Sequence, residues 1–236
     1  MTLLSVTKDV CAAVGVLIPP TSIFTSITGN RTMQEMLSLA NEMAQRISYD
    51  TREWTALKVL ATMTGDGIKT AFDLPADYKR MLLTANVWRS TQTQFPMRFI
   101  VDTDEWIQRR AQGNYDTRGE WTIMGGKMHI QPVLKVGQTA TFAYLHKNCI
   151  TLAAGGAGDA FMADGDSFVL GDRLLKLGMI WQWKAYKGTP YTEDMGTYGD
   201  ALTMAMGTDQ PAPIYIGRTP ISANAATAYP FPAPTP

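Results

Sequence analysis

The sequence predicts an α+β fold in which helices from the N- and C-terminal parts form one bundle, and a small antiparallel β domain is inserted in the chain between them. Apolar residues recur at helical spacing near both ends of the 236-residue chain, whereas the middle alternates with a period of two. Proline is frequent beyond residue 210, so we expect an extended tail there. The expected divisions are bundle helices at 1–61, the β insert at 62–150, further bundle helices at 151–209 and the tail at 210–236.

Two helices are expected in the N-terminal part. Apolar positions at helical spacing predict the first over residues 5–16, and Pro19 prevents it from continuing. Asn30 or Thr32 can cap the second, which extends to residue 47. Each helix presents one apolar stripe, so both need a packing partner from later in the chain.

Strands are expected in the middle of the chain. The clearest pair is a hairpin of residues 121–124 and 127–130, because the Gly125-Gly126 pair between them readily adopts the positive φ angles of a primed turn. Further strands are expected at residues 71–75, 81–89, 98–101 and 138–145.

Two short helices and a connector complete this middle region. A short third helix is expected to carry Trp54 and Leu57, and Thr103 or Asp104 can cap another one. Residues 153–159 are rich in glycine and alanine, which predicts a flexible connector.

Helical periodicity returns after the connector. Asp166 or Ser167 can cap a helix that runs to about Lys187, and the next helix is expected over residues 191–206, before Gly207. The first of these helices has an apolar stripe of Leu170, Leu174, Leu177 and Trp181, widened by Ile180 and Trp183.

Composition and charge exclude several classes of protein. With 45% hydrophobic and 18% charged residues the chain is not globally disordered, and 21 basic against 21 acidic residues give no excess for a nucleic-acid clamp. Cys11 and Cys149 form no disulfide framework or zinc motif, so we expect a reducing compartment. The first 20 residues make a poor signal peptide, and no window is long and apolar enough to predict a membrane span.

Few residues suggest catalysis or metal binding. His129 and His146 could act as a general base or a metal ligand, but we expect both to be ordinary strand residues. Asp159, Asp164 and Asp166 resemble part of an EF-hand loop, yet no glutamate follows at the twelfth position. We therefore expect these aspartates to cap a helix, and we expect no catalytic residue, metal or cofactor.

Glycine runs and basic residues give two further candidate sites. The runs at 125–126 and 155–158 lack the Lys-Ser or Lys-Thr of a phosphate-binding loop, so we interpret them as turn and linker. Arg109 and Arg110 belong to the densest basic segment and could touch a phosphate backbone. Acidic residues are interleaved with them, so a solvated face or a subunit interface is the favoured interpretation.

The tail contains apolar residues that a solvated linker does not need. Ile214, Tyr215, Ile216, Tyr229 and Phe231 can serve as anchors for a partner. We expect the tail to bind a neighbouring subunit or another protein as an extended strap, with folding back onto its own domain as the alternative.

The order and spacing of four segments resemble the head-to-tail adaptor, or connector, proteins of tailed bacteriophages, in particular the group related to the tail tubular protein A of short-tailed phages. Together the segments span about residues 3 to 208. They are LSLANEMAQRISYDTREWTAL, FDLPADYKRM, WTIMGGKMHIQPVLKVGQTATFAYLHKN and DGDSFVLGDRLLKLGMIWQWKAYKGTPYTEDMGTYGDAL.

The resemblance implies a structural protein of the virion neck, synthesised in the host cytoplasm, and no enzyme. It implies a ring, with twelve subunits expected, between the portal protein and a tail or neck protein. Double-stranded DNA would pass through this ring without sequence-specific binding, and no membrane would be involved. The alternatives are a protein-binding module that forms no ring and, less favoured, an enzyme of cell-wall or nucleotide metabolism.

Overall fold

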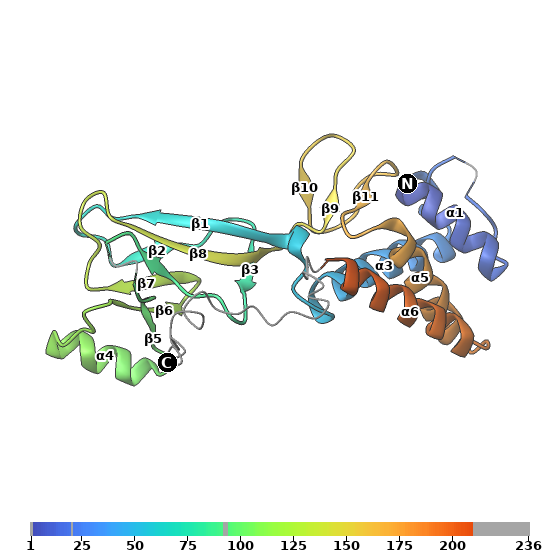
Figure 1. Cartoon of the computed structure of the whole chain (residues 1–236). Coiled ribbons are helices and arrows are strands. Elements are labelled where there is room, and N and C mark those ends of the chain that lie inside the picture. The colour runs from blue at the N-terminus through green and yellow to red at the C-terminus, as the bar shows by residue number, and fades with distance from the viewer. Residues whose placement is uncertain (1, 20, 92–93, 210–236) are drawn as a thin grey trace, which may run out of the picture.

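The computed structural model describes residues 2–19, 21–91 and 94–209, and it is a mixed α+β structure. The molecule is elongated, with most helices at one end and most strands at the other (Figure 1). We call residues 58–146 the sheet end and the rest of the described chain the helical end.

The helical end contains α1 (Leu3–Val14), α2 (Ile23–Ser26), α3 (Arg31–Gln45), a π-helical turn (Arg46–Asp50), a 3-10 turn (Thr55–Leu57), α5 (Asp172–Tyr186) and α6 (Thr192–Asp209). Helix α5 contacts α1, α3 and α6, so residues far apart in the sequence share one hydrophobic core. Met36, Met43 and Met179 are completely buried in it. None of the described helices has the length and apolar composition needed to span a membrane.

The sheet end is built from two four-stranded sheets and one helix. The sheet elements are β1 (Lys58–Thr64), β2 (Ala71–Asp73), β3 (Tyr78–Met81), β4 (Trp88–Arg89), β5 (Arg98–Phe99), β6 (Glu120–Met124), β7 (Lys127–Gln131) and β8 (Thr139–His146), and α4 is Thr103–Gln112. One sheet has the order β1-β8-β3, with β4 also paired to β8, and the other has the order β2-β7-β6-β5. A second core lies here, with Met128, Ile130, Leu134 and Phe142 among its buried residues.

Several sequence predictions are confirmed. Strands β6 and β7 form the expected hairpin, and Gly125 and Gly126 have φ angles of 56° and 73°. The Asn30 side chain caps α3 by accepting from the backbone N–H groups of Thr32 and Met33.

Other predictions for the first two-thirds of the chain are wrong in detail. The expected third helix is only a 3-10 turn, and the β insert, expected from residue 62, begins with an unpredicted strand at Lys58. The single strand expected over 81–89 is two strands, β3 and β4, separated by a turn. Asp102, not Thr103 or Asp104, caps α4, and β5 pairs with β6 in parallel, so the insert is not entirely antiparallel.

The segment before α5 differs most from the prediction. The expected flexible connector belongs to a small sheet of β9 (Ile150–Thr151), β10 (Ala157–Gly158) and β11 (Ser167–Phe168). Because β11 occupies the expected helix start, α5 begins at Asp172 and Gly171 is its cap. The buried face of α5 includes Trp183, while Trp181 is only half-buried.

Asp166 has a different function from the predicted helix cap. Its buried carboxylate accepts hydrogen bonds from the backbone N–H groups of Ala153, Met162 and Ala163 at 2.7–2.9 Å. It therefore ties the loop between β10 and β11 to the turn that follows β9. Helix α6 continues through Gly207 to Asp209, and the predicted tail anchors lie outside the described residues.

Candidate functional site

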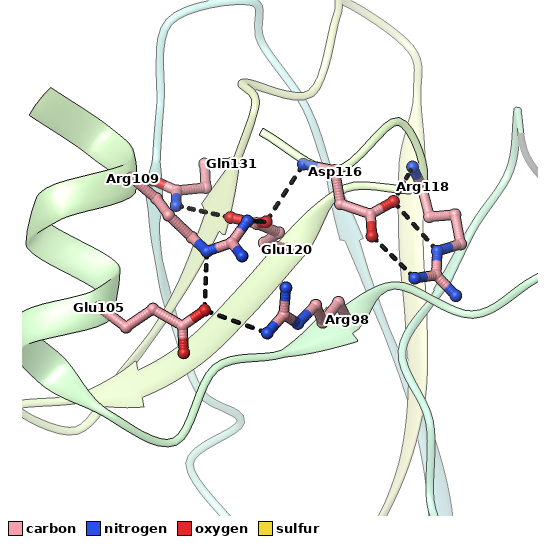
Figure 2. Close-up of polar contacts among 7 residues, drawn as sticks. All are labelled: Arg98, Glu105, Arg109, Asp116, Arg118, Glu120 and Gln131. Carbon is pink, nitrogen blue, oxygen red and sulfur yellow. Dashed lines mark hydrogen bonds and ion pairs between the residues drawn. The ribbon is translucent and has the colours of Figure 1, made fainter. Parts of the chain in front are cut away.

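Arg109 is the centre of an ion-pair network between α4 and the neighbouring sheet (Figure 2). Its Nε donates to Glu105 Oε1 at 2.8 Å, and its Nη1 donates to Glu120 Oε1 at 2.7 Å. Glu105 also accepts from Arg98 on β5 at 3.0 Å. The network therefore ties α4 to both β5 and β6.

Glu120 is the buried member of this network. Its side chain is 0% exposed, and it accepts hydrogen bonds from Arg109, from the Asp116 backbone N–H at 3.1 Å and from Gln131 Nε2 at 3.1 Å. A buried carboxylate is tolerated when it is paired and hydrogen-bonded in this way. Arg109 is thus committed to a contact within the chain.

Arg118 is also paired within the chain. It forms a two-pronged contact with Asp116, at 3.0 Å from Nε and 2.7 Å from Nη2. Hydrogen bonds from the Arg118 side chain and backbone N–H lower the pKa of Asp116 to about 2. Both charges of this pair are therefore present throughout the neutral pH range.

Arg110 differs from these arginines. It is exposed in the last turn of α4 and makes no ion pair with any residue in the described part of the chain. It borders a pocket of about 300 Å³ between α4 and β7. The other residues that line this pocket are Thr70, Trp106, Tyr115, His129, Ile130, Gln131, Pro132 and Val133.

Three aromatic residues, Trp106, Tyr115 and His129, line part of the pocket. The Trp106 and His129 rings meet edge to face at a centroid distance of 6.4 Å. Trp106 Nε1 and Gln131 Oε1 are both buried and have no hydrogen-bond partner among the described residues. We call Arg110, Trp106, Tyr115 and His129 the Arg110 site.

The Arg110 site is suited to an acidic group. A guanidinium forms strong charge-assisted hydrogen bonds with a carboxylate, and no acidic side chain of the described chain occupies this one. The described residues contain no cluster of three or more side chains suited to a metal ion. The exposed Arg110 guanidinium, without an ion pair in the described chain, is chemically able to bind an anion.

The structure separates the two arginines that the sequence had grouped together. Arg109 stabilises the chain internally, whereas Arg110 faces outward. Both histidines lie in strands, as predicted, and His146 Nδ1 accepts from the Asn148 backbone N–H at 3.1 Å.

Sequence reasoning missed the contribution of Trp106 and Tyr115 to a pocket. The only sequence signal was the four-residue spacing from Trp106 to Arg110, which places both on one side of a helix.

Comparisons with protein-family models and with curated proteins found no match for this chain.

Proposed function

We propose that this protein is a structural subunit of a tailed-bacteriophage virion, a head-to-tail adaptor that forms a ring between the portal and the tail. The resemblance of four sequence segments to such adaptors supports this proposal. The elongated molecule, with separate cores at its two ends, suits a subunit that contacts different neighbours at each end (Figure 1).

The structural observation that supports the proposal is the contrast between Arg109 and Arg110. Arg109 holds α4 against the sheet, and Arg110 on the next position is exposed beside a pocket without an ion-pair partner in the described chain. Charged groups at protein interfaces face opposite charges on the partner, so Arg110 is available to pair with a partner's carboxylate.

In this proposal the helices of residues 1–61 and 151–209 act as one bundle. Helix α5 is its central member because it contacts α1, α3 and α6. The sheet end, residues 58–146, projects from the bundle and carries the Arg110 site. The tail from residue 210 serves as a strap to a neighbouring subunit, the portal or a tail protein.

Native mass spectrometry of the full chain, alone and mixed with the portal protein from the same virion, tests the proposal. We expect a closed ring of defined copy number in at least one of these samples, with a central opening for double-stranded DNA in electron micrographs. A chain that stays monomeric in both samples contradicts the adaptor function.

A protein-binding module without ring assembly is the second candidate. The Arg110 site favours it as well, because a single anionic partner could occupy the pocket. A stable one-to-one complex with a partner protein, and no larger assembly, would support this alternative.

A further inference from the structure

Helix α6 is acidic and contains no basic residue. Its four acidic residues are Glu193, Asp194, Asp200 and Asp209. Asp194 pairs with Lys184 at 2.6 Å, and Asp209 lies 3.7 Å from Arg52. Glu193 and Asp200 are exposed and make no ion pair within residues 2–19, 21–91 and 94–209.

These two acidic residues lie on one exposed face of α6. Glu193 and Asp200 are seven residues apart, which is about two turns of a helix. Met204 follows Asp200 by four residues on the same side and is 74% exposed. We call Glu193, Asp200 and Met204 the α6 face.

Local helix stability does not account for the whole α6 face. Acidic residues in a first turn favour a helix by interacting with its dipole, which explains Glu193 and Asp194. Asp200 lies in the middle of the helix, where this effect is absent. The Met204 side chain is exposed, so it contributes no burial of apolar surface to the stability of the chain.

The α6 face and the Arg110 site complement each other but lie far apart in one molecule. Helix α6 is at the helical end, and α4 is at the opposite side of the sheet end (Figure 1). Next to Arg110, Ile107 is 58% exposed, so both surfaces combine an unpaired charge with an exposed apolar side chain. The two surfaces can meet only between different copies of the chain.

We propose that the Arg110 site of one copy binds the α6 face of a second copy. The Arg110 guanidinium pairs with a carboxylate of Glu193 or Asp200, while Ile107 and Met204 are covered in the same contact. Different surfaces are used on the two copies, so each copy keeps one free site, and repetition generates a ring when the rotation closes. The inference rests on the proposed ring assembly and identifies one of its subunit contacts.

Charge reversal in the full chain tests this contact. We expect Arg110→Glu to require at least a tenfold higher protein concentration for half-assembly in sedimentation velocity, because like charges then face each other. Arg173→Glu is the matched control, since Arg173 is exposed on α5 and the change in net charge is identical. It should assemble like the wild type. Thermal unfolding of both variants should match the wild type, because both side chains are exposed.

Compensating substitutions identify the partner residue. Adding Asp200→Lys or Glu193→Lys to Arg110→Glu should restore assembly to within about threefold of the wild type, whereas either lysine variant alone should weaken it. Rings of Arg110→Glu as stable as the wild type overturn the inference but leave the adaptor function standing. Failure of both compensating substitutions also overturns it. A monomeric wild-type chain contradicts the proposed function itself.

Discussion

Arg109 Nη1 lies 2.7 Å from Glu120 Oε1, and the Glu120 side chain is completely buried. The Arg109 guanidinium therefore compensates a carboxylate that has no access to water. Arg110, the next residue, has no such function within the described chain.

Arg109→Ala should destabilise the protein and Arg110→Ala should not. Without Arg109, the buried Glu120 carboxylate loses its cation and keeps only the Asp116 and Gln131 donors, so the free energy of unfolding should fall. Loss of the exposed Arg110 should change stability by less than about 0.5 kcal/mol. Urea denaturation of the two variants measures the difference. Equal losses in both would contradict the assignment of Arg109 as structural.

Gly65→Ala should be strongly destabilising. A Cβ atom at Gly65 would clash with Leu134 Cβ and would lie 2.6 Å from the Leu134 carbonyl oxygen, so the backbone would have to move. We expect a loss of roughly 3 kcal/mol in denaturant titration. Gly199→Ala is the control, because nothing lies within 4 Å of that Cβ and alanine favours the α6 helix by up to about 1 kcal/mol.

Asp166→Asn should loosen the loop between β10 and β11 at neutral pH. Burial raises the pKa of Asp166, but the three backbone N–H donors outweigh it, so that the pKa is lower than in an unfolded chain. The stabilisation is present above the unfolded pKa of about 4 and is lost as the pH falls through the folded pKa. We expect a loss of about 3 kcal/mol at pH 7 that shrinks below pH 4.

The exposed Asp159 provides the comparison for this pH dependence. Asp159→Asn should leave stability near the wild-type value across the same pH range, because no hydrogen bond from the described chain reaches its carboxylate. A pH-independent loss in Asp166→Asn would show that the contribution of Asp166 does not depend on its charge.

Trp183→Ala should cost more stability than Trp181→Ala. Trp183 is 6% exposed, and the cavity left by its removal should lower the free energy of unfolding by about 3 to 5 kcal/mol. Trp181 is half-buried between Tyr198 and Arg46, where solvent can partly fill the space. Thermal unfolding of the two variants shows which substitution costs more stability. A larger loss for Trp181→Ala would contradict this prediction and would support the sequence prediction that Trp181 belongs to the main apolar stripe.

The sequence determined those elements whose signals lie within a few neighbouring residues. Apolar spacing located α1, α3 and α6, and the Gly125-Gly126 pair located the hairpin, because periodicity and turn geometry are local properties. The same reasoning failed before α5. There Ser167 and Phe168 pair with Thr151 and Ile150, a contact that helix signals in the neighbouring sequence do not reveal.

Only the tertiary structure decided which charges are internal and which are free. Arg109 and Arg110 are adjacent in the sequence, but successive residues on a helix point about 100° apart. One side chain therefore faces the buried Glu120, and the other lies beside the pocket. Likewise, Asp166 is of a residue type that often caps helices, but its carboxylate accepts hydrogen bonds from loop residues. The partner of a charge depends on how distant segments pack, and that packing is not encoded in the local pattern around it.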